Sequence, residues 1–74
     1  MTAREMFEKN GYKLVVDNDV VIVYSARLTS IKFNKLLEGY EAFYRDDCCA
    51  NMIFMGVHKA IHQQLLELGW LDVD

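Results

Sequence analysis

Apolar and polar residues alternate along the first half of the chain with the two-residue period of β-strands. Residues 12–16 and 20–25 are rich in β-branched and aromatic side chains, and the turn formers of residues 17–19 separate them as in a hairpin. The second segment is apolar on both faces, which predicts a central strand. Residues 29–34 and 40–44 continue the alternation, so two further strands are expected.

A helical period replaces this alternation near the start of the chain. Thr2 and Glu5 match a capping box, in which each side chain bonds the backbone N–H of the other residue. Gly11 supplies a residue suited to the left-handed end of a helix. The predicted helix, residues 3–9, is about two turns long and needs tertiary packing to be stable. Its apolar face consists of Ala3, Met6 and Phe7.

The longest helical pattern covers residues 57–68 and follows residues 52–55, which are expected to form a brief strand or an extended lead-in. Four apolar residues fall in one arc of this helix and should face the sheet: Val57, Ile61, Leu65 and Leu68. Gly69 and Trp70 then match a Schellman ending. The chain, residues 1–74, is therefore predicted to be one compact α+β domain. This domain is expected to consist of a short N-terminal helix, an antiparallel sheet of three to five strands and a longer C-terminal helix packed on the sheet.

Composition and charge limit the classes of function that the chain can have. The 74 residues are 53% hydrophobic, which suits one folded core, and the net charge is −3. The absence of a basic cluster argues against direct nucleic-acid binding. No apolar run reaches the roughly 20 residues needed to span a bilayer, and the charged N-terminal sequence does not match a signal peptide. We therefore expect a cytoplasmic protein.

The only cysteines and histidines of the chain lie within fifteen residues of each other. His58 and His62 stand one helical turn apart, so their imidazoles project in nearly the same direction, at the margin of the apolar arc and partly sheltered. Cys48 and Cys49 precede them in a polar loop. We therefore expect Cys48, Cys49, His58 and His62 to supply two thiolates and two imidazoles to a closed tetrahedral zinc site, which would be structural rather than catalytic. Such a staple stabilises a small domain.

Alternatives to this ligand set remain open. Adjacent cysteines point to opposite faces of an extended segment, so both Cys48 and Cys49 ligate only if the loop bends sharply between them. Otherwise one thiolate binds, and Asp46 or Asp47 supplies the fourth ligand. A buried cysteine is also often only a small apolar residue, and histidines on a helix flank are frequently solvent-facing.

Catalysis is not expected. The helix segment His58-Lys59-Ala60-Ile61-His62 lacks the glutamate that follows the first histidine in metalloprotease helices. A cysteine with His58 could form a nucleophile–base pair, but no phosphate-binding glycine loop is present and a chain of this length leaves little room for an enclosed pocket. A binding function is favoured instead.

Three segments of the chain form a further pattern: residues 2–12, the strand Ile31-Lys32-Phe33 and the closing segment 58–70, which ends in Leu-Gly-Trp. Together these segments resemble a class of small bacteriophage and prophage proteins of Gram-positive bacteria. Within this class the chain is most similar to an anti-CRISPR inhibitor of a type II effector nuclease that carries a structural metal. The cysteine pair departs from the general scaffold of the class, as a specialised member would.

The resemblance implies stoichiometric inhibition of a type II CRISPR effector nuclease, in which an acidic surface docks on a basic channel and blocks nucleic-acid engagement. The candidate contact residues are Asp17, Asp19, Glu38, Glu41, Asp46 and Asp47. A solvated acidic surface that keeps a small protein soluble is the simpler interpretation of these residues. The competing functional class is a self-associating structural or regulatory phage protein, with Tyr40 and Tyr44 at a dimer interface. A monomer or a weak dimer is compatible with the sequence.

Overall fold

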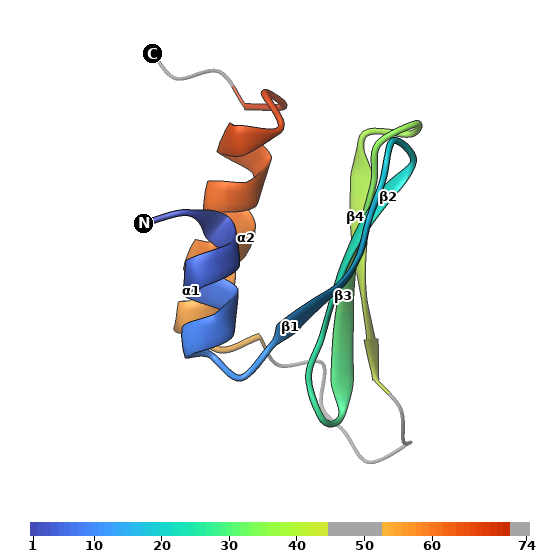
Figure 1. Ribbon diagram of the computed structural model, residues 1–74. Helices are drawn as coiled ribbons and strands as arrows, with labels where there is room; N and C mark the ends of the chain where they lie inside the picture. The colour runs from blue at the N-terminus through green and yellow to red at the C-terminus, as the bar shows by residue number, and fades with distance from the viewer. Residues whose placement is uncertain (45–52, 72–74) are drawn as a thin grey trace.

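The computed structural model describes residues 1–44 and 53–71, which form two layers (Figure 1). One layer is a four-stranded antiparallel sheet in which the strands follow one another in chain order, β1-β2-β3-β4. The other layer contains two helices. The elements are α1 (Ala3–Lys9), β1 (Lys13–Asp17), β2 (Val21–Ser25), β3 (Thr29–Asn34), β4 (Gly39–Tyr44) and α2 (Met55–Glu67). The predicted α+β fold is confirmed.

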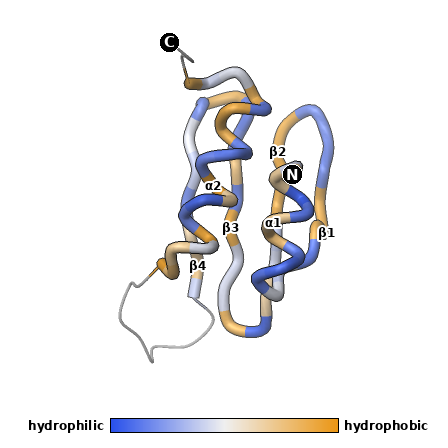
Figure 2. The backbone as a smooth tube through the Cα atoms, turned by 90° about the vertical axis from the view of Figure 1, so that its left-hand side faces the viewer, coloured by the Kyte–Doolittle hydropathy of each residue, from blue (hydrophilic) through white to orange (hydrophobic). Residues whose placement is uncertain are grey.

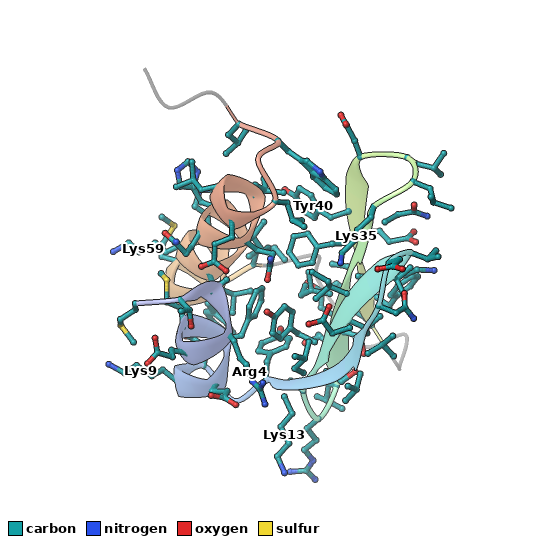
Figure 3. The ribbon with its side chains drawn as sticks, turned by 45° about the horizontal axis from the view of Figure 1, so that its top comes forward. Arg4, Lys9, Lys13, Lys35, Tyr40 and Lys59 are labelled. Carbon is teal, nitrogen blue, oxygen red and sulfur yellow. The ribbon has the colours of Figure 1, made fainter. Side chains whose placement is uncertain are left out.

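The two helices lie side by side on the same face of the sheet (Figure 2). In Figure 2 α1 lies in front of the β1–β2 half of the sheet and α2 in front of the β3–β4 half. Lys9 and Lys59 point away from the sheet on the outer side of the helices (Figure 3). None of the helices in residues 1–44 and 53–71 is both long and apolar enough to cross a membrane.

The sequence signals at the start of α1 are all present. Glu5 donates its backbone N–H to the Thr2 hydroxyl at 3.2 Å, and Thr2 donates its own backbone N–H to the Glu5 carboxylate at 2.9 Å. The Thr2 hydroxyl also donates to the Glu5 carboxylate at 3.1 Å. The two bonds that the carboxylate accepts, from the Thr2 backbone N–H and from this hydroxyl, lower the pKa of Glu5, because they stabilise its ionised form. Gly11 follows the helix with a φ of 86°, a left-handed conformation that favours glycine.

α2 begins two residues before the predicted start and ends as the sequence indicated. Gly69 has a φ of 76° and donates its N–H to Leu66, while Trp70 donates to Leu65, both at 3.0 Å. This pair of bonds is the predicted Schellman ending. Near the first turn, Gly56 passes so close to Asn10 that a Cβ at this position would collide with the Asn10 side chain. A glycine therefore allows α2 to approach the end of α1.

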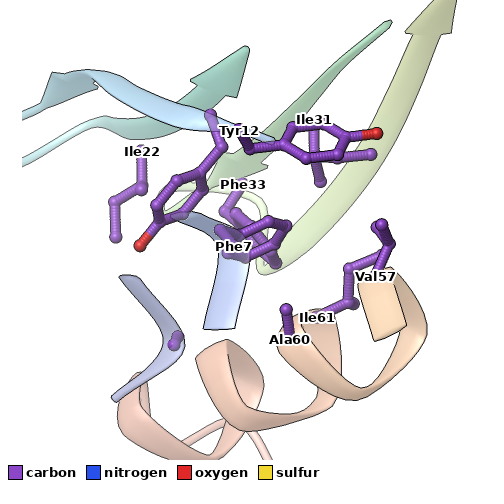
Figure 4. Packing of buried hydrophobic residues seen from close by; sticks show 10 residues of the cluster. Phe7, Tyr12, Ile22, Ile31, Phe33, Val57, Ala60 and Ile61 are labelled. Carbon is purple, nitrogen blue, oxygen red and sulfur yellow. The ribbon is translucent and has the colours of Figure 1, made fainter. Parts of the chain in front are cut away.

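The core lies between the helices and the sheet. Phe7 is fully buried at its centre, stacked on Tyr24 with ring centroids 4.0 Å apart and meeting Phe33 edge to face at 6.2 Å (Figure 4). Aromatic pairs in these geometries add about 0.5–1.5 kcal/mol each beyond the burial of area. The buried cluster is Ala3, Phe7, Tyr12, Ile22, Tyr24, Ile31, Phe33, Val57, Ala60 and Ile61. Of the predicted arc of α2, Val57 and Ile61 are buried, and Leu65 and Leu68 pack at the margin.

Polar side chains inside the core are paired. The Tyr24 hydroxyl donates to the side-chain oxygen of Gln64 at 2.7 Å, and both residues are buried. Burial raises the pKa of Tyr24 to about 12, because the ionised phenolate would lose its hydration. The backbone N–H of Ala3 donates to the Glu67 carboxylate at 2.7 Å, which joins α1 to the last turn of α2. Within the described ranges, every buried side-chain nitrogen and oxygen has a hydrogen-bond partner.

The sheet is covered unevenly. β2 lies between β1 and β3, as its apolar sequence predicted, but only Ile22 and Tyr24 on its helix side are buried. β4 is exposed on both of its faces: Tyr40 on the helix side has 51% of its surface accessible, and Phe43 on the opposite side has 44%. The buried residues of the sheet therefore lie on the two central strands, β2 and β3, and both edge strands, β1 and β4, are largely exposed.

Candidate functional site

The predicted metal ligands are only partly within the described residues. His58 and His62 lie one turn apart on α2, and both are exposed. Their predicted partial shelter is therefore wrong, because Ala60 and Gln64 occupy the buried face beside Val57 and Ile61. No group of three or more histidine, cysteine, aspartate or glutamate side chains suited to a metal ion occurs in residues 1–44 and 53–71. Cys48, Cys49, Asp46 and Asp47 lie outside these ranges. The histidine pair supplies at most half of a tetrahedral site.

The predicted acidic contact residues are brought together in part. Asp17 is the last residue of β1, Asp19 lies in the β1–β2 turn, and Glu38 lies in the β3–β4 turn. The backbone N–H of Lys35 donates to the Val20 carbonyl at 2.8 Å, so the two turns lie against each other at one end of the sheet. Figure 1 shows both turns at the same end, remote from the start of β1. We call residues 17–20 and 35–38 the acidic tip.

Lys35 holds the two halves of the acidic tip in place. Its ammonium group donates to the Asn18 carbonyl at 2.7 Å and lies 3.8 Å from the Asp17 carboxylate. The tip thus contains three carboxylates and one internally engaged ammonium group, and carries a negative net charge. Lys13 and Arg27 lie at the opposite end of the sheet, and Figure 3 shows Lys13 far from Lys35. The sheet is therefore polarised in charge along its strands.

Two asparagines shape the turns of the acidic tip in the same way. Asn18 accepts the backbone N–H groups of Val20 and Val21 with its side-chain oxygen, at 2.8 and 2.9 Å. Asn34 accepts those of Leu36 and Leu37, at 3.0 Å each. Each asparagine oxygen thus supplies a hydrogen-bond acceptor to two backbone N–H groups of its own turn. Both turns are therefore internally ordered without burying their side chains.

The β3–β4 turn presents two leucines to solvent. Leu36 and Leu37 have 72% and 80% of their surface accessible, the largest exposed fractions among the big apolar residues of the described chain. Turns are usually built from small and polar residues, so an adjacent leucine pair at this position is unusual. Glu38 closes the turn with a φ of 52°, a left-handed conformation that is costly for a residue other than glycine. The turn is held in this shape despite the local strain.

A shallow depression of about 210 Å³ lies beside the leucines at the β3–β4 hairpin. It is lined by Lys32, Asn34, Leu37, Gly39, Tyr40 and Glu41. Lys32 and Glu41 pair across β3 and β4 on the side of the sheet opposite the helices. Glu41 is therefore next to the acidic tip but on the open face of the sheet, and it is not part of the cluster formed by Asp17, Asp19 and Glu38.

The leucine pair was not among the residues singled out from the sequence. The signal that could have found it is the placement of two large apolar residues between a strand ending in Asn34 and the turn residue Gly39. Such residues have no core-facing position in a tight connection. Comparison with known proteins found no matching family model, no similar curated protein and no similar solved structure. The acidic tip is therefore interpreted from its own residues.

Proposed function

We propose that the protein is a non-enzymatic inhibitor that docks the acidic tip into a basic, partly apolar groove of another protein. The resemblance seen in the sequence makes a type II CRISPR effector nuclease of the host the first partner to test. In that setting the tip competes with nucleic acid for a positively charged channel, and the proposed site of action is the host cytoplasm.

The observation that carries this proposal is the exposed pair Leu36 and Leu37 on an ordered turn. Binding interfaces gain most of their affinity from a few large side chains that fill a pocket on the partner. An anchor is effective when it loses little conformational freedom on binding. The Asn34 bonds and the contact of Lys35 with the neighbouring turn fix the backbone beneath the leucines before a partner arrives.

The charges around the leucines indicate the kind of partner. Asp17, Asp19 and Glu38 surround the anchor with carboxylates, and the nearest ammonium group, that of Lys35, is already engaged within the tip. A partner groove rimmed with lysine and arginine complements this arrangement and accelerates association. Channels that bind nucleic acid have this chemistry because they must neutralise phosphates.

A structural zinc is retained in the proposal as a separate element. His58 and His62 supply two imidazoles on one side of α2, and Cys48 with Cys49, or one cysteine with Asp46 or Asp47, complete the ligand set. The exposure of the histidines is compatible with a site at the surface of α2. Its role is to stabilise the fold and not to take part in docking, because α2 lies on the opposite side of the core from the acidic tip.

The docking proposal is tested by co-purification and nuclease inhibition with purified type II effectors. Replacing the anchor, Leu36→Asn with Leu37→Asn, is expected to weaken inhibition by at least about tenfold, which corresponds to about 1.4 kcal/mol of binding free energy. Val15→Thr is the matched control, because Val15 is also exposed but lies on the β1 edge. Equal loss in both variants, or no complex with any effector, would contradict the proposal.

The charges are tested by the salt dependence of association. Neutralising the rim with Asp17→Asn, Asp19→Asn and Glu38→Gln is expected to slow association at low salt and to flatten its dependence on ionic strength. Glu8→Gln is the control, because Glu8 is exposed on α1, remote from the tip. An unchanged salt dependence would show that the carboxylates do not face the partner.

The zinc is tested independently. Elemental analysis of protein purified without chelator is expected to give about one zinc per chain, and a strong chelator is expected to lower the melting temperature. His62→Ala should abolish both effects while leaving the acidic tip intact. Metal-free protein with an unchanged melting temperature would remove zinc from the proposal without affecting the docking surface.

A further inference from the structure

β4 is an edge strand of the sheet with exposed residues on both faces. Tyr40 and Ala42 on its helix side and Glu41 and Phe43 on the opposite side are all exposed. Its one neighbour in the described sheet is β3. The strand is rich in aromatic residues and contains no proline, lysine or bulge, three of the features that usually prevent edge strands from pairing with another chain.

The other edge of the sheet is different. Within β1 the register to β2 shifts between Leu14 and Val16, so Val15 is an extra residue in a β-bulge. A bulge interrupts the regular row of backbone groups and bends the strand, which protects an edge from further pairing. β4 pairs with β3 in unbroken register from Gly39 to Tyr44. The chain therefore protects one edge and leaves the other regular.

The alternation of backbone hydrogen bonds decides which groups of β4 face outward. Lys35 donates its N–H to the Val20 carbonyl at the end of β3, so the odd-numbered residues of β3 bond to β2. The even-numbered residues of β3 therefore form the backbone hydrogen bonds to β4. Their partners in β4 are Gly39, Glu41 and Phe43. The N–H and C=O groups of Tyr40 and Ala42 are directed to the outer edge.

The single charge on β4 selects how this edge can pair with its own copy. Two antiparallel registers keep side chains on matching faces and use most of the strand. A two-fold axis at Glu41 would place two carboxylates opposite each other in a pair whose Cα atoms are about 4.5 Å apart, which is repulsive. An axis at Ala42 instead pairs two small side chains and sets Glu41 opposite Phe43 of the second copy. We propose that two copies of the chain associate through β4 about an axis at Ala42.

The resulting dimer has one continuous antiparallel sheet, four strands from each copy. Because β4 runs antiparallel to its own copy, the two acidic tips lie at opposite ends of the joined sheet. The interface buries the outer faces of Tyr40 and Phe43 and leaves Leu36 and Leu37 accessible. The dimer is independent of tip docking, since the two surfaces use different residues.

Sedimentation velocity on the full chain, from micromolar to millimolar concentration, tests the dimer. A concentration-dependent dimer is expected. Ala42→Pro should weaken dimerisation by at least about tenfold, because proline removes the outward N–H and leaves the bonds to β3 in place. Ala42→Thr keeps the N–H and should retain the dimer, as should the tip variant Leu36→Asn with Leu37→Asn. A wild-type protein that is monomeric at millimolar concentration, or a dimer unaffected by Ala42→Pro, would overturn the proposal.

Cross-linking identifies the register even if Ala42→Pro impairs folding. In a Cys48→Ser, Cys49→Ser background, Ala42→Cys is expected to form a disulfide-linked dimer, because the paired Cα atoms lie about 5.5 Å apart, within disulfide range. Glu41→Cys should cross-link much more slowly, because it lies off the axis. Faster cross-linking through position 41 than through position 42 would reject the proposed axis.

Discussion

The helix-covered part of the sheet and the β3–β4 hairpin use large apolar residues in opposite ways. Phe7 and Phe33 are fully buried and in contact with each other, whereas Leu36, Leu37 and Phe43 are exposed. Both regions are ordered, one by packing and the other by asparagine side chains that bond the turn backbone. The comparison indicates that the first region supplies the stability of this small fold and that the second contains the surfaces proposed for binding.

The largest expected effect on the free energy of unfolding is the difference between truncating a buried and an exposed phenylalanine. Phe7→Ala should lower the free energy of unfolding by about 3–5 kcal/mol, because it removes a fully buried ring and leaves a cavity. Phe43→Ala, the same substitution at a half-exposed position on β4, should cost less than about 1 kcal/mol. Urea denaturation followed by circular dichroism measures both. Similar losses in the two variants would break the comparison.

A smaller effect concerns the buried hydrogen bond between the layers. Gln64→Leu should cost about 1–3 kcal/mol, because it leaves the Tyr24 hydroxyl buried without an acceptor. Adding Tyr24→Phe should recover much of this loss, since both partners are then apolar. A double-mutant cycle from urea midpoints tests the coupling. Additive losses would mean that Tyr24 and Gln64 act independently.

The raised pKa of Tyr24 leads us to expect a loss of folding stability at high pH. An exposed tyrosine ionises near pH 10, whereas the pKa of Tyr24 is raised to about 12 in the folded chain. The folded state therefore holds this proton more tightly than the unfolded state. The contribution is complete below pH 10 and is lost as the pH rises through 12. Urea midpoints measured across this window should fall more steeply for wild type than for Tyr24→Phe, and parallel curves would contradict the assignment.

The smallest expected effect on stability concerns the β3–β4 hairpin, and it is a stabilisation. Glu38→Gly should stabilise the fold by about 0.5 kcal/mol, because glycine relieves the left-handed strain but gains freedom in the unfolded chain. Thermal unfolding measures the change, and Gly11→Ala is the converse control, since it introduces the same strain. Destabilisation by Glu38→Gly would show that the glutamate side chain contributes more than its backbone conformation costs.

The local patterns predicted most of the fold. Capping at Thr2, the β1–β2 hairpin and the Gly69–Trp70 ending depend on neighbouring residues, and each was expected from the sequence. The start of α2 was placed two residues late because Phe54 caps the helix without a side-chain bond, so no capping signal marks it. The alternation of the β4 side chains between the two faces of the sheet was expected from the sequence. The exposure of these side chains depends on how the helices are placed over the sheet, which no local pattern encodes.

The candidate site was less predictable, because it is built from two turns that are distant in the sequence. Asp17, Asp19 and Glu38 were expected on one contact surface, and the contacts of Lys35 with the β1–β2 turn show how they come together. The leucine pair has no helical or strand period to mark it. His58 and His62 were placed too near the apolar arc, because the buried positions of α2 are centred on Ala60 and Gln64.

The bond between Ala3 and Glu67 has a consequence for synthesis of the protein. α1 is made first, but it packs against α2, the last helix of the described chain. While the ribosome is still translating the strands, Ala3 and the adjacent face of α1 have no partner, and a two-turn helix is unstable alone. The contact between α1 and α2 can therefore form only after Glu67 has left the exit tunnel.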